Sequence, residues 1–181
     1  MDANKVVKRV KTNQIGIFLP ALTGDLHLQC YSDASFANLS DCGSQGGLIV
    51  FLADSKGHRC PIMWKSRRIR RVVKSTLAAE TMALLEAAES GCYIGRIFED
   101  IGIAERLPIK CYVDNKSLVG ALRSVKKVDD KYLRINIACL KDMLERKDIT
   151  TVEWVDTGKQ LANCLTKKGA SPHALLEAIS K

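Results

Sequence analysis

The chain lacks any apolar segment long enough to cross a membrane, because no run approaches the roughly 18 apolar residues that a spanning helix needs. Its first residues, 1–11, are rich in Lys and Val and contain no apolar core of the signal-peptide kind. These two absences predict an intracellular protein that makes no contact with a membrane.

The chain also lacks a Cys-x-x-Cys pair, although it contains seven cysteines. An odd number of scattered cysteines argues against a zinc ribbon and against a disulfide framework. Several of them stand in apolar segments, which favours small buried side chains. Histidine is scarce as well. His27, His58 and His173 lie near none of the serines discussed below, so the sequence does not support a Ser-His-Asp hydrolase.

What is present suits a single globular domain, or one domain with a tail. The chain has 181 residues, 46% of them hydrophobic, which predicts a real core. The formal net charge is +8 with a pI near 9.2. Because the basic excess is clustered, it favours a polyanionic partner.

A short sequence motif that ends in aspartate occurs twice. Residues 26–33 and 108–114 both have the alternation of a half-buried β-strand, and they close on Cys-Tyr-Ser-Asp and Cys-Tyr-Val-Asp. Period-two spacing puts Tyr31 and Asp33 on one side of the first strand, and Tyr112 and Asp114 on one side of the second. Each aspartate is therefore expected as the last residue of its strand, pointing the same way relative to the sheet.

Parallel neighbours would bring Asp33 and Asp114 together at the carboxyl edge of a sheet, where open α/β sheets bind ligands. Two carboxylates at that distance raise each other's pKa unless a cation lies between them. The arrangement therefore predicts a metal site made of hard oxygen ligands.

The remaining elements follow in a β-β-β-α-(α)-β-α-α-β-α order. Strands are expected at 48–52, 61–65 and 150–155, and helices at 77–90, 92–100, 115–123, 131–146, within 157–169 and at 172–179. Residues 1–24 are expected to form a lead-in with one short helix, and residues 25–181 the domain. This order predicts an α/β fold with a five-stranded mixed sheet, three strands antiparallel and two parallel, flanked by helices.

A helix that begins at Ser75 or Thr76 carries a carboxylate on its apolar side. Glu80 has Leu77, Ala83, Leu84 and Ala87 at helical spacing, so it is expected to face the interior. An inward carboxylate is costly unless it is paired, hydrogen-bonded or bound to a metal ion. A position at the rim of the stripe, with the carboxylate reaching water, is the alternative.

At this point the sequence resembles ribonuclease H, and in its local motifs the ribonuclease H domain of copia-type retrotransposon reverse transcriptases. The resemblance covers roughly residues 26–170. It rests on four stretches in the order of that family, namely 31–35 (YSDAS), 75–80 (STLAAE), 112–117 (YVDNKS) and 160–167 (QLANCLTK).

The resemblance implies the acids of the site. The first three map onto Asp33, Glu80 and Asp114, which the strand and helix patterns select independently. The fourth falls at Asn163, where related elements carry Asp. An asparagine keeps a carbonyl oxygen but loses a charge, so weaker metal binding is expected there. An engineered change, a tolerated natural variant and an inactive copy all remain open, and Asp156 is a further, less favoured source of the missing charge.

The activity that the resemblance implies is hydrolysis of the RNA strand of an RNA–DNA hybrid with two Mg²⁺ ions, for which Mn²⁺ is a substitute. Asp33 would be shared between the ions, and Glu80 would also contact the ribose 2′-hydroxyl. The implied partner in the parent polyprotein is the polymerase domain, and the implied location is the cytoplasm, in the virus-like particle of the element.

Contacts to the hybrid are expected from two kinds of residue. The basic segment 65–74, expected as a loop, suits contacts to phosphates, and the Gly-rich loop 38–47 allows the backbone to approach the groove closely. Polar residues beside the acids suit phosphate and ribose. The predicted contacts are Ser35, Gly46, Gly47, Lys65, Arg67, Arg68, Arg70, Arg71, Ser75, Thr76 and Asn115.

Two other functions stay open. Integrases and Holliday-junction nucleases also gather acids at a strand edge, but the order of the motifs fits ribonuclease H better. A catalytically inactive or repurposed module that binds hybrids or proteins is the main alternative. The oligomeric state is not indicated by the sequence.

Overall fold

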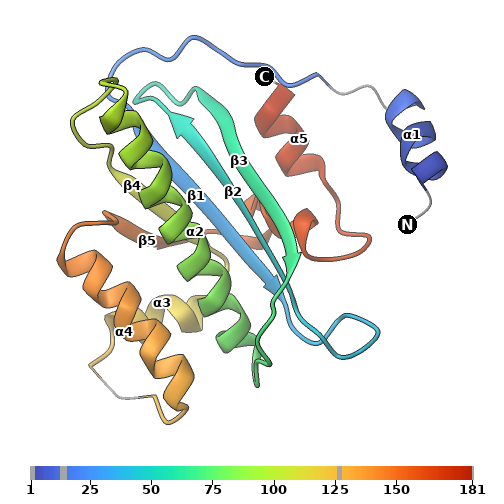
Figure 1. Cartoon of the computed structure of the whole chain (residues 1–181), viewed down its shortest axis with the longest axis vertical. Coiled ribbons are helices and arrows are strands. Elements are labelled where there is room, and N and C mark those ends of the chain that lie inside the picture. The colour runs from blue at the N-terminus through green and yellow to red at the C-terminus, as the bar shows by residue number, and fades with distance from the viewer. Residues whose placement is uncertain (1–2, 13–15, 126–127, 181) are drawn as a thin grey trace.

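A computed structural model describes residues 3–12, 16–125 and 128–180 of the chain (Figure 1). Five strands form one sheet in the order β3-β2-β1-β4-β5. The β1–β2 and β2–β3 pairs are antiparallel, and the β1–β4 and β4–β5 pairs are parallel, which confirms the predicted mixed sheet. The strands are β1 (His27–Ser35), β2 (Gln45–Ala53), β3 (Arg59–Arg68), β4 (Ile109–Val113) and β5 (Thr151–Trp154).

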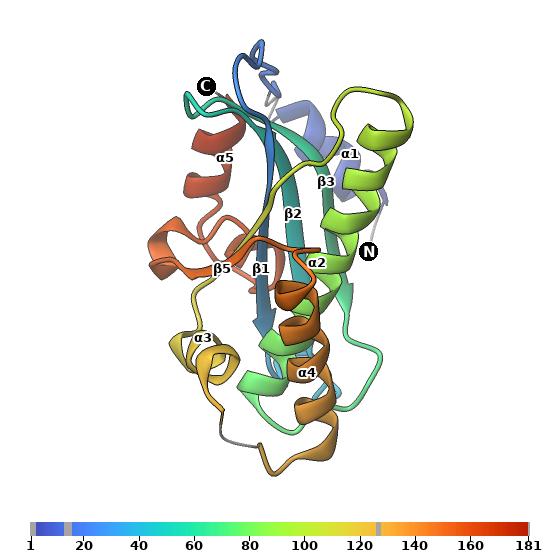
Figure 2. The same ribbon diagram turned by 90° about the vertical axis from the view of Figure 1, so that its left-hand side faces the viewer.

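Helices cover both faces of this sheet. In Figure 2 the sheet is seen nearly edge-on, with α5 on one side and α2 and α4 on the other. No helix among the described residues is long and apolar enough to span a membrane. The helices are α1 (Ala3–Thr12), α2 (Thr76–Asp100), α3 (Lys116–Arg123), α4 (Lys131–Glu145) and α5 (His173–Ser180), with 3₁₀ turns η1 (Thr157–Lys159) and η2 (Asn163–Leu165).

Alternation along the strands divides the core into two layers. On β1, Leu28 and Cys30 pack in the large cluster with α2, α3 and α4, whereas Tyr31 packs in a smaller cluster with residues of the η1–η2 region and α5. On β2, Val50 and Phe51 separate in the same way. This period of two is the one that the sequence predicts for half-buried strands.

Helix α2 is continuous over 25 residues, so the predicted division into helices at 77–90 and 92–100 is wrong. Ser75 is its N-cap, and the hydroxyl oxygen accepts a hydrogen bond from the Ala78 amide at 3.1 Å. Gly91 does not break the helix. A Cβ at Gly91 would lie 2.8 Å from Cys30 Sγ and 3.0 Å from Ile109 Cγ2, so the glycine lets α2 lie close against the sheet.

The second and third strands extend further than predicted. Gly46 and Gly47 belong to β2, and Arg67 and Arg68 belong to β3, so the loop assignment of these residues is wrong. Strand β3 lies at the edge of the sheet, and half of its residues face solvent. An edge strand with one solvent-exposed face accommodates polar and basic side chains. A run of such side chains in the sequence predicts a loop.

The C-terminal region contains the short turns η1 and η2 in place of the helix predicted within 157–169. Buried Gln160 holds this region to the sheet. Its side-chain amide donates to the carbonyl oxygens of Ser32 at 3.0 Å and Tyr112 at 3.3 Å, and its Oε1 accepts from the Ala162 amide. The residues that follow Gln160 are thereby fixed beside the ends of β1 and β4.

The region before β1 contains the predicted short helix, α1. Residues 1–2 and 13–15 of the predicted lead-in lie outside the described residues. Phe18 donates its amide to the Ile179 carbonyl at 2.8 Å, and Thr23 donates its amide to Asp54 Oδ2 at 3.0 Å. Hydrogen bonds from the backbone amides of Thr23, His58 and Lys56 hold the pKa of the buried Asp54 well below its usual range. The domain boundary at residue 24 stays a prediction.

All seven cysteines are free.

Gly47→Ala is expected to destabilise the domain by about 1–3 kcal/mol. A Cβ at Gly47 would lie 2.8 Å from both Leu165 Cβ and Thr166 Cγ2, so the η2 segment would have to shift. Urea unfolding measures the effect. Gly120→Ala is the matched control, because its Cβ would meet nothing within 4 Å, and a helical Gly→Ala change of that kind stabilises by about 0.5–1 kcal/mol. Equal stabilities for the two variants would contradict this packing.

Candidate active site

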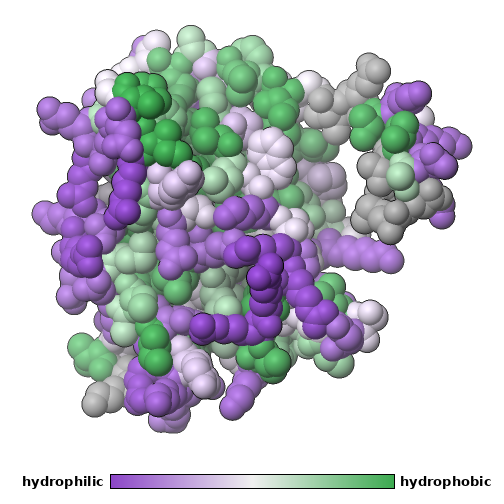
Figure 3. Space-filling model, in the orientation of Figure 1, coloured by the Kyte–Doolittle hydropathy of each residue, from purple (hydrophilic) through white to green (hydrophobic). Residues whose placement is uncertain are grey.

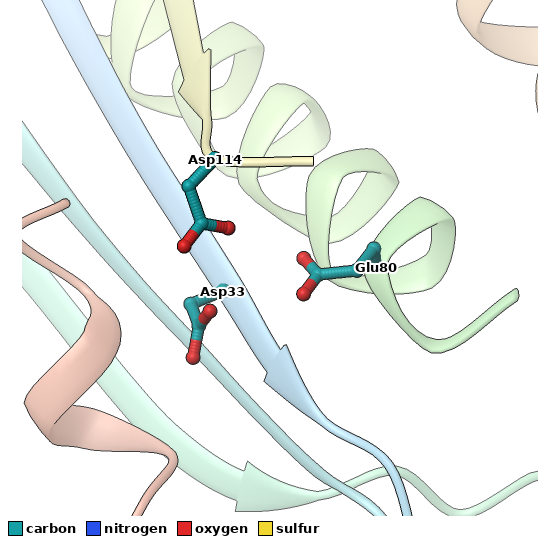
Figure 4. A group of neighbouring side chains, drawn as sticks. All are labelled: Asp33, Glu80 and Asp114. Atoms are coloured by element: carbon teal, nitrogen blue, oxygen red, sulfur yellow. The ribbon is translucent and has the colours of Figure 1, made fainter. Parts of the chain in front are cut away.

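Three carboxylates meet at one edge of the sheet. Carboxylate oxygens of Asp33, Glu80 and Asp114 lie within 4.8 Å of one another. Figure 4 shows that they point into the same space from three elements, with Asp33 on β1, Glu80 on α2 and Asp114 directly after β4. Asp33 and Asp114 therefore converge, as the repeated sequence motif predicts, although Asp33 lies two residues before the end of its strand.

Strand register explains how the two aspartates meet. In the parallel β1–β4 pair, Tyr31 lies opposite Tyr112, and their rings stack with centroids 4.7 Å apart. The pairing of β1 with β4 ends at these tyrosines, whereas β1 continues to Ser35 beside β2. Asp33 and Asp114 thus follow the last paired residues of the two strands, and Glu80 meets them from α2.

Glu80 faces inward, as the apolar stripe predicts, and is 4% exposed. Burial, and then the nearby charges of Asp33 and Asp114, raise its pKa to about 8. Its Oε2 atom is buried and has no hydrogen-bond partner among the described residues. A buried carboxylate oxygen without a partner is costly, and a cation would remove that cost.

Asp33 is fully buried, and burial raises the pKa of its carboxyl group. Hydrogen bonds offset part of that effect. Thr166 Oγ1 donates to Asp33 Oδ2, and Lys167 Nζ lies 3.4 Å from Asp33 Oδ1. Both carboxylate oxygens of Asp33 therefore have a donor from the η2 side of the site.

Asp114 is held from the β5 side. Thr157 Oγ1 donates to Asp114 Oδ2 at 2.9 Å, and Trp154 Nε1 donates to the Asp114 carbonyl oxygen at 3.0 Å. The Lys116 ammonium lies 4.4 Å from the centre of the Trp154 ring. These contacts fix the backbone and side chain of Asp114 at the end of β4.

Asn163 begins η2 and is joined to Asp33 by Lys167. Its Oδ1 accepts a hydrogen bond from Lys167 Nζ at 2.7 Å. Asp156 does not take the place of the missing acid, because its Oδ1 accepts from the Gly158 amide at 2.9 Å and caps η1, and its side chain is exposed. Asp156 is thus a solvent-facing acid of the turn, in agreement with its place as the less favoured source of the missing charge.

Sequence reasoning singled out the acids but none of the residues that contact them. Thr157, Thr166 and Lys167 hydrogen-bond to the aspartates. One signal was available for Lys167, since it stands four residues after Asn163 within the motif 160–167. The contacts of Thr157 depend on the tertiary fold, and no local pattern indicates them.

An open cavity of about 550 Å³ adjoins the carboxylates. Three of the predicted contacts to nucleic acid, Ser35, Thr76 and Asn115, line it. Asn115 also caps α3, with its Oδ1 accepting from the Leu118 amide at 3.0 Å. Ser75 is committed to its capping bond in α2. The other lining residues are Ala34, Phe36, Glu80, Asp114, Lys116, Trp154 and Lys167.

The remaining predicted contacts line a second cavity, of about 240 Å³, between β2, β3 and α2. Its walls include Gly46, Gly47, Lys65, Arg67, Arg68, Arg70 and Arg71. Figure 3 shows hydrophilic side chains over the middle and lower part of this face. The basic residues predicted from sequence therefore share one surface.

Several of these basic residues are already paired within the protein. Glu86 accepts from Arg67 at 2.8 Å and from Lys65 at 3.5 Å, so its carboxylate is paired with two of the cations of this cavity. Arg68 pairs with Asp41. Arg70 and Arg71 are exposed and make no ion pair among the described residues. Their charges are the more available ones for a polyanion.

Replacing Arg70 and Arg71 together with alanine is expected to weaken hybrid binding irrespective of base sequence. The slope of log affinity against log salt concentration should decrease by about two, because two phosphate contacts are lost. Fluorescence anisotropy with labelled hybrids at several salt concentrations measures it. The control pair is Lys56→Ala with Arg96→Ala, two exposed cations outside both cavities. An unchanged slope in the Arg70/Arg71 pair would refute the contact.

The donor set fits a divalent cation such as Mg²⁺ or Mn²⁺. Three carboxylates supply hard oxygen ligands, and Glu80 Oε2 is a buried acceptor that no described residue hydrogen-bonds. Burial and mutual repulsion disfavour three negative charges at this distance unless a cation neutralises them. The identity and number of ions remain predictions from sequence.

Comparison with known proteins gives relatives among transposon polyproteins. The chain is 32% identical over 157 residues to the retrovirus-related Pol polyprotein from transposon RE1 of Arabidopsis thaliana, and 31% identical over 157 residues to the one from transposon RE2. Each match covers 84% of this chain and 10% of the polyprotein, so the chain spans about a tenth of the length of these relatives. No family model matches the chain.

Solved structures share the fold. RNase H1 from Halobacterium salinarum NRC-1 has a TM-score of 0.55 and 18% identity, over 84% of this chain and 99% of that one. LC11-RNase H1 in complex with an RNA/DNA hybrid has a TM-score of 0.56 and 18% identity, over 77% of this chain and 93% of that one.

The chain has the ribonuclease H fold and is homologous to a segment of transposon Pol polyproteins. The resemblance to a ribonuclease H domain of a retrotransposon is thereby confirmed. The foamy viral protease-reverse transcriptase, solved with an RNA/DNA hybrid, carries the same fold within a larger chain, with a TM-score of 0.56 and 13% identity over 85% of this chain and 21% of that one. The assignment of this ribonuclease H-like domain to the copia type stays a prediction.

Proposed function

We propose that this domain hydrolyses the RNA strand of RNA–DNA hybrids with the help of Mg²⁺ held by Asp33, Glu80 and Asp114. One observation carries the proposal. Three carboxylates from β1, α2 and the end of β4 lie within 4.8 Å of one another beside an open cavity, and one buried oxygen of Glu80 has no partner in the part of the chain that the structure describes. The homology and the fold support the same class of hydrolase.

A divalent cation bound by these carboxylates would lower the pKa of a bound water and offset the charge that develops on the scissile phosphate. Asp33 is fixed for this task by Thr166 and Lys167, and Asp114 by Thr157. Because Glu80 has a raised pKa, it must lose a proton before it acts as a ligand, so cation binding should strengthen as the pH rises toward 8.

The hybrid would be bound by its shape and backbone. Ser35, Thr76 and Asn115 line the cavity beside the acids and suit ribose and phosphate. The basic cavity between β2, β3 and α2, with Arg70 and Arg71 free of ion pairs among the described residues, suits the phosphates of the other strand. Binding should therefore fall steeply with salt.

The domain would act beside a polymerase domain during reverse transcription of a copia-type element, in the cytoplasmic particle of that element. Support comes from the relatives, which are Pol polyproteins of which this chain matches about a tenth. Cleavage by the isolated chain and by a longer polyprotein segment, compared on the same hybrid, would test whether the neighbouring domain improves the grip on the substrate.

The decisive experiment compares the native chain with Asn163→Asp on a labelled hybrid in Mg²⁺ or Mn²⁺. The added carboxylate should strengthen cation binding, and we expect Asn163→Asp to cleave at least about tenfold faster, equivalent to about 1.4 kcal/mol. Equal rates would show that Asn163 is tolerated. Cleavage by the Asp form alone would mean that the native chain is a hybrid-binding module.

Absence of both cleavage and hybrid binding in the two proteins would rule out the proposed function. Asn136→Asp is a matched control, because it makes the same chemical change on α4, at a residue that lines neither cavity of the site. Its cleavage rate should stay within about twofold of the native rate.

A further inference from the structure

The two sides of the Asp33 carboxylate differ in what they contain. Toward α2 lie Glu80 and Asp114, whose carboxylates converge on Asp33, and Glu80 Oε2 has no partner among residues 3–12, 16–125 and 128–180. Toward η2 lie two donors, Thr166 Oγ1 on Asp33 Oδ2 and Lys167 Nζ on Asp33 Oδ1. The α2 side is therefore rich in acceptors and suited to a metal cation, whereas the η2 side already contains the ammonium of Lys167.

Lys167 places its ammonium between the two residues that would hold a second ion. Nζ lies 3.4 Å from Asp33 Oδ1 and 2.7 Å from Asn163 Oδ1. Lys167 and Asn163 are four residues apart, and the η2 turn brings their side chains together. The adjacent Thr166 anchors this turn to Asp33 and also donates to the Asn163 carbonyl at 3.1 Å, so Lys167 is attached to a segment that is itself fixed.

The chemistry at this position favours an ammonium over a divalent cation. A lysine ammonium donates up to three hydrogen bonds, and both neutral and charged oxygens accept them. Mg²⁺ is bound mainly through carboxylates, and here it would find Asp33, already shared, and the neutral amide of Asn163. A second divalent ion would also be repelled by the ammonium at this distance.

We propose that Lys167 supplies the second positive charge of the site in place of a metal ion, so that the chain binds one divalent cation, at Asp33, Glu80 and Asp114. This inference rests on the proposed function, in which those three residues bind Mg²⁺. It differs from the two-ion site that the resemblance implies. Without a fourth carboxylate at position 163, a second metal ion is bound poorly. The ammonium of Lys167, hydrogen-bonded to Asn163, supplies the positive charge that this ion would bring.

The number of bound ions tests this inference without any measurement of cleavage. Free Mn²⁺ is followed by electron paramagnetic resonance while the protein is titrated, for four proteins: native, Lys167→Gln with Asn163→Asp, Lys168→Gln, and Asp33→Asn. Lys168 is the matched control, because it is the exposed neighbouring lysine and lines neither cavity of the site. Circular dichroism confirms that each protein is folded.

We expect one Mn²⁺ per chain for the native protein and for Lys168→Gln, and two per chain for the double variant. Two ions in the native protein would overturn the role of Lys167 while leaving the metal site of the proposed function intact. One ion in both the native protein and the double variant would overturn it as well. No ion in the native protein would remove the proposed metal site itself, and the role of Lys167 with it.

Discussion

Asp33→Asn is expected to lower the rate of RNA-strand cleavage by about 10³-fold or more. The carboxylate of Asp33 is fully buried and converges with both other acids, so its replacement removes a negative charge from the centre of the cluster. Loss of several kcal/mol of cation-dependent stabilisation of the transition state corresponds to a decrease of this size. Single-turnover cleavage of a labelled hybrid in saturating Mg²⁺ measures the rate.

The fold should survive this change, because an asparagine keeps a side-chain oxygen that accepts from the Thr166 hydroxyl. Asp142→Asn is the matched control. It makes the same change on α4, where the exposed Asp142 pairs with Arg146 at 3.5 Å, and its rate should equal the native rate. A rate for Asp33→Asn within tenfold of the native rate would show that this carboxylate is not part of the reacting centre.

Without divalent cations, the free energy of unfolding is expected to fall as the pH rises from about 5 to about 8. The ordinary pKa of a glutamate is 4.5, and burial beside two aspartates raises that of Glu80 to about 8. Between these values the unfolded chain has lost the proton and the folded chain retains it. The folded state is therefore favoured at low pH, and its advantage decreases by at most about 1.4 kcal/mol per pH unit.

Thermal unfolding in EDTA across this pH range measures the effect, and Glu80→Gln isolates it. The raised pKa of Asp33 also makes the folded state less favourable as the pH rises, and the lowered pKa of His27 has the opposite effect on stability. Both groups remain in the variant, so their effects cancel in the comparison. The native protein should lose stability relative to Glu80→Gln as the pH rises, and Mn²⁺ should restore it in the native protein alone. Glu89→Gln, at an exposed position of α2, is the control. Parallel curves for native and Glu80→Gln would contradict the buried position of this carboxylate.

The three acids could be predicted because each follows from a local period. Alternation along residues 26–33 and 108–114 places Asp33 and Asp114 on the same side as Tyr31 and Tyr112, which lie opposite each other in the sheet. The helical stripe turns Glu80 inward. Periods of 2 and 3.6 are set by the backbone itself, so they are visible in a single sequence.

Other features depend on contacts between distant segments and left no such pattern. Gly91 looks like the end of a helix, yet α2 continues through it and lies so close to the sheet there that a Cβ would meet Cys30 Sγ at 2.8 Å. The basic residues of β3 look like a loop, because the strand lies at the sheet edge with one wet face. The pairing of Lys167 with Asp33 joins residues 134 positions apart, and only the folded chain brings them together.

The neutral residue at position 163 acquires a different meaning once Lys167 is seen beside it. An asparagine in place of a fourth acid, taken alone, indicates a weakened nuclease. The ammonium 2.7 Å from its amide oxygen shows that the position is occupied by a positive charge of the protein itself. Loss of a negative charge and presence of a tethered cation act in the same direction on a second divalent ion, since both make its binding less favourable.

The most direct test of the shared carboxylate site is the anomalous diffraction of Mn²⁺ in crystals of the native chain. The account predicts an anomalous peak bounded by oxygens of Asp33, Glu80 and Asp114, at ligand distances of about 2.0–2.4 Å. A protein that cleaves hybrids in Mn²⁺ but shows no peak between these three carboxylates would contradict it.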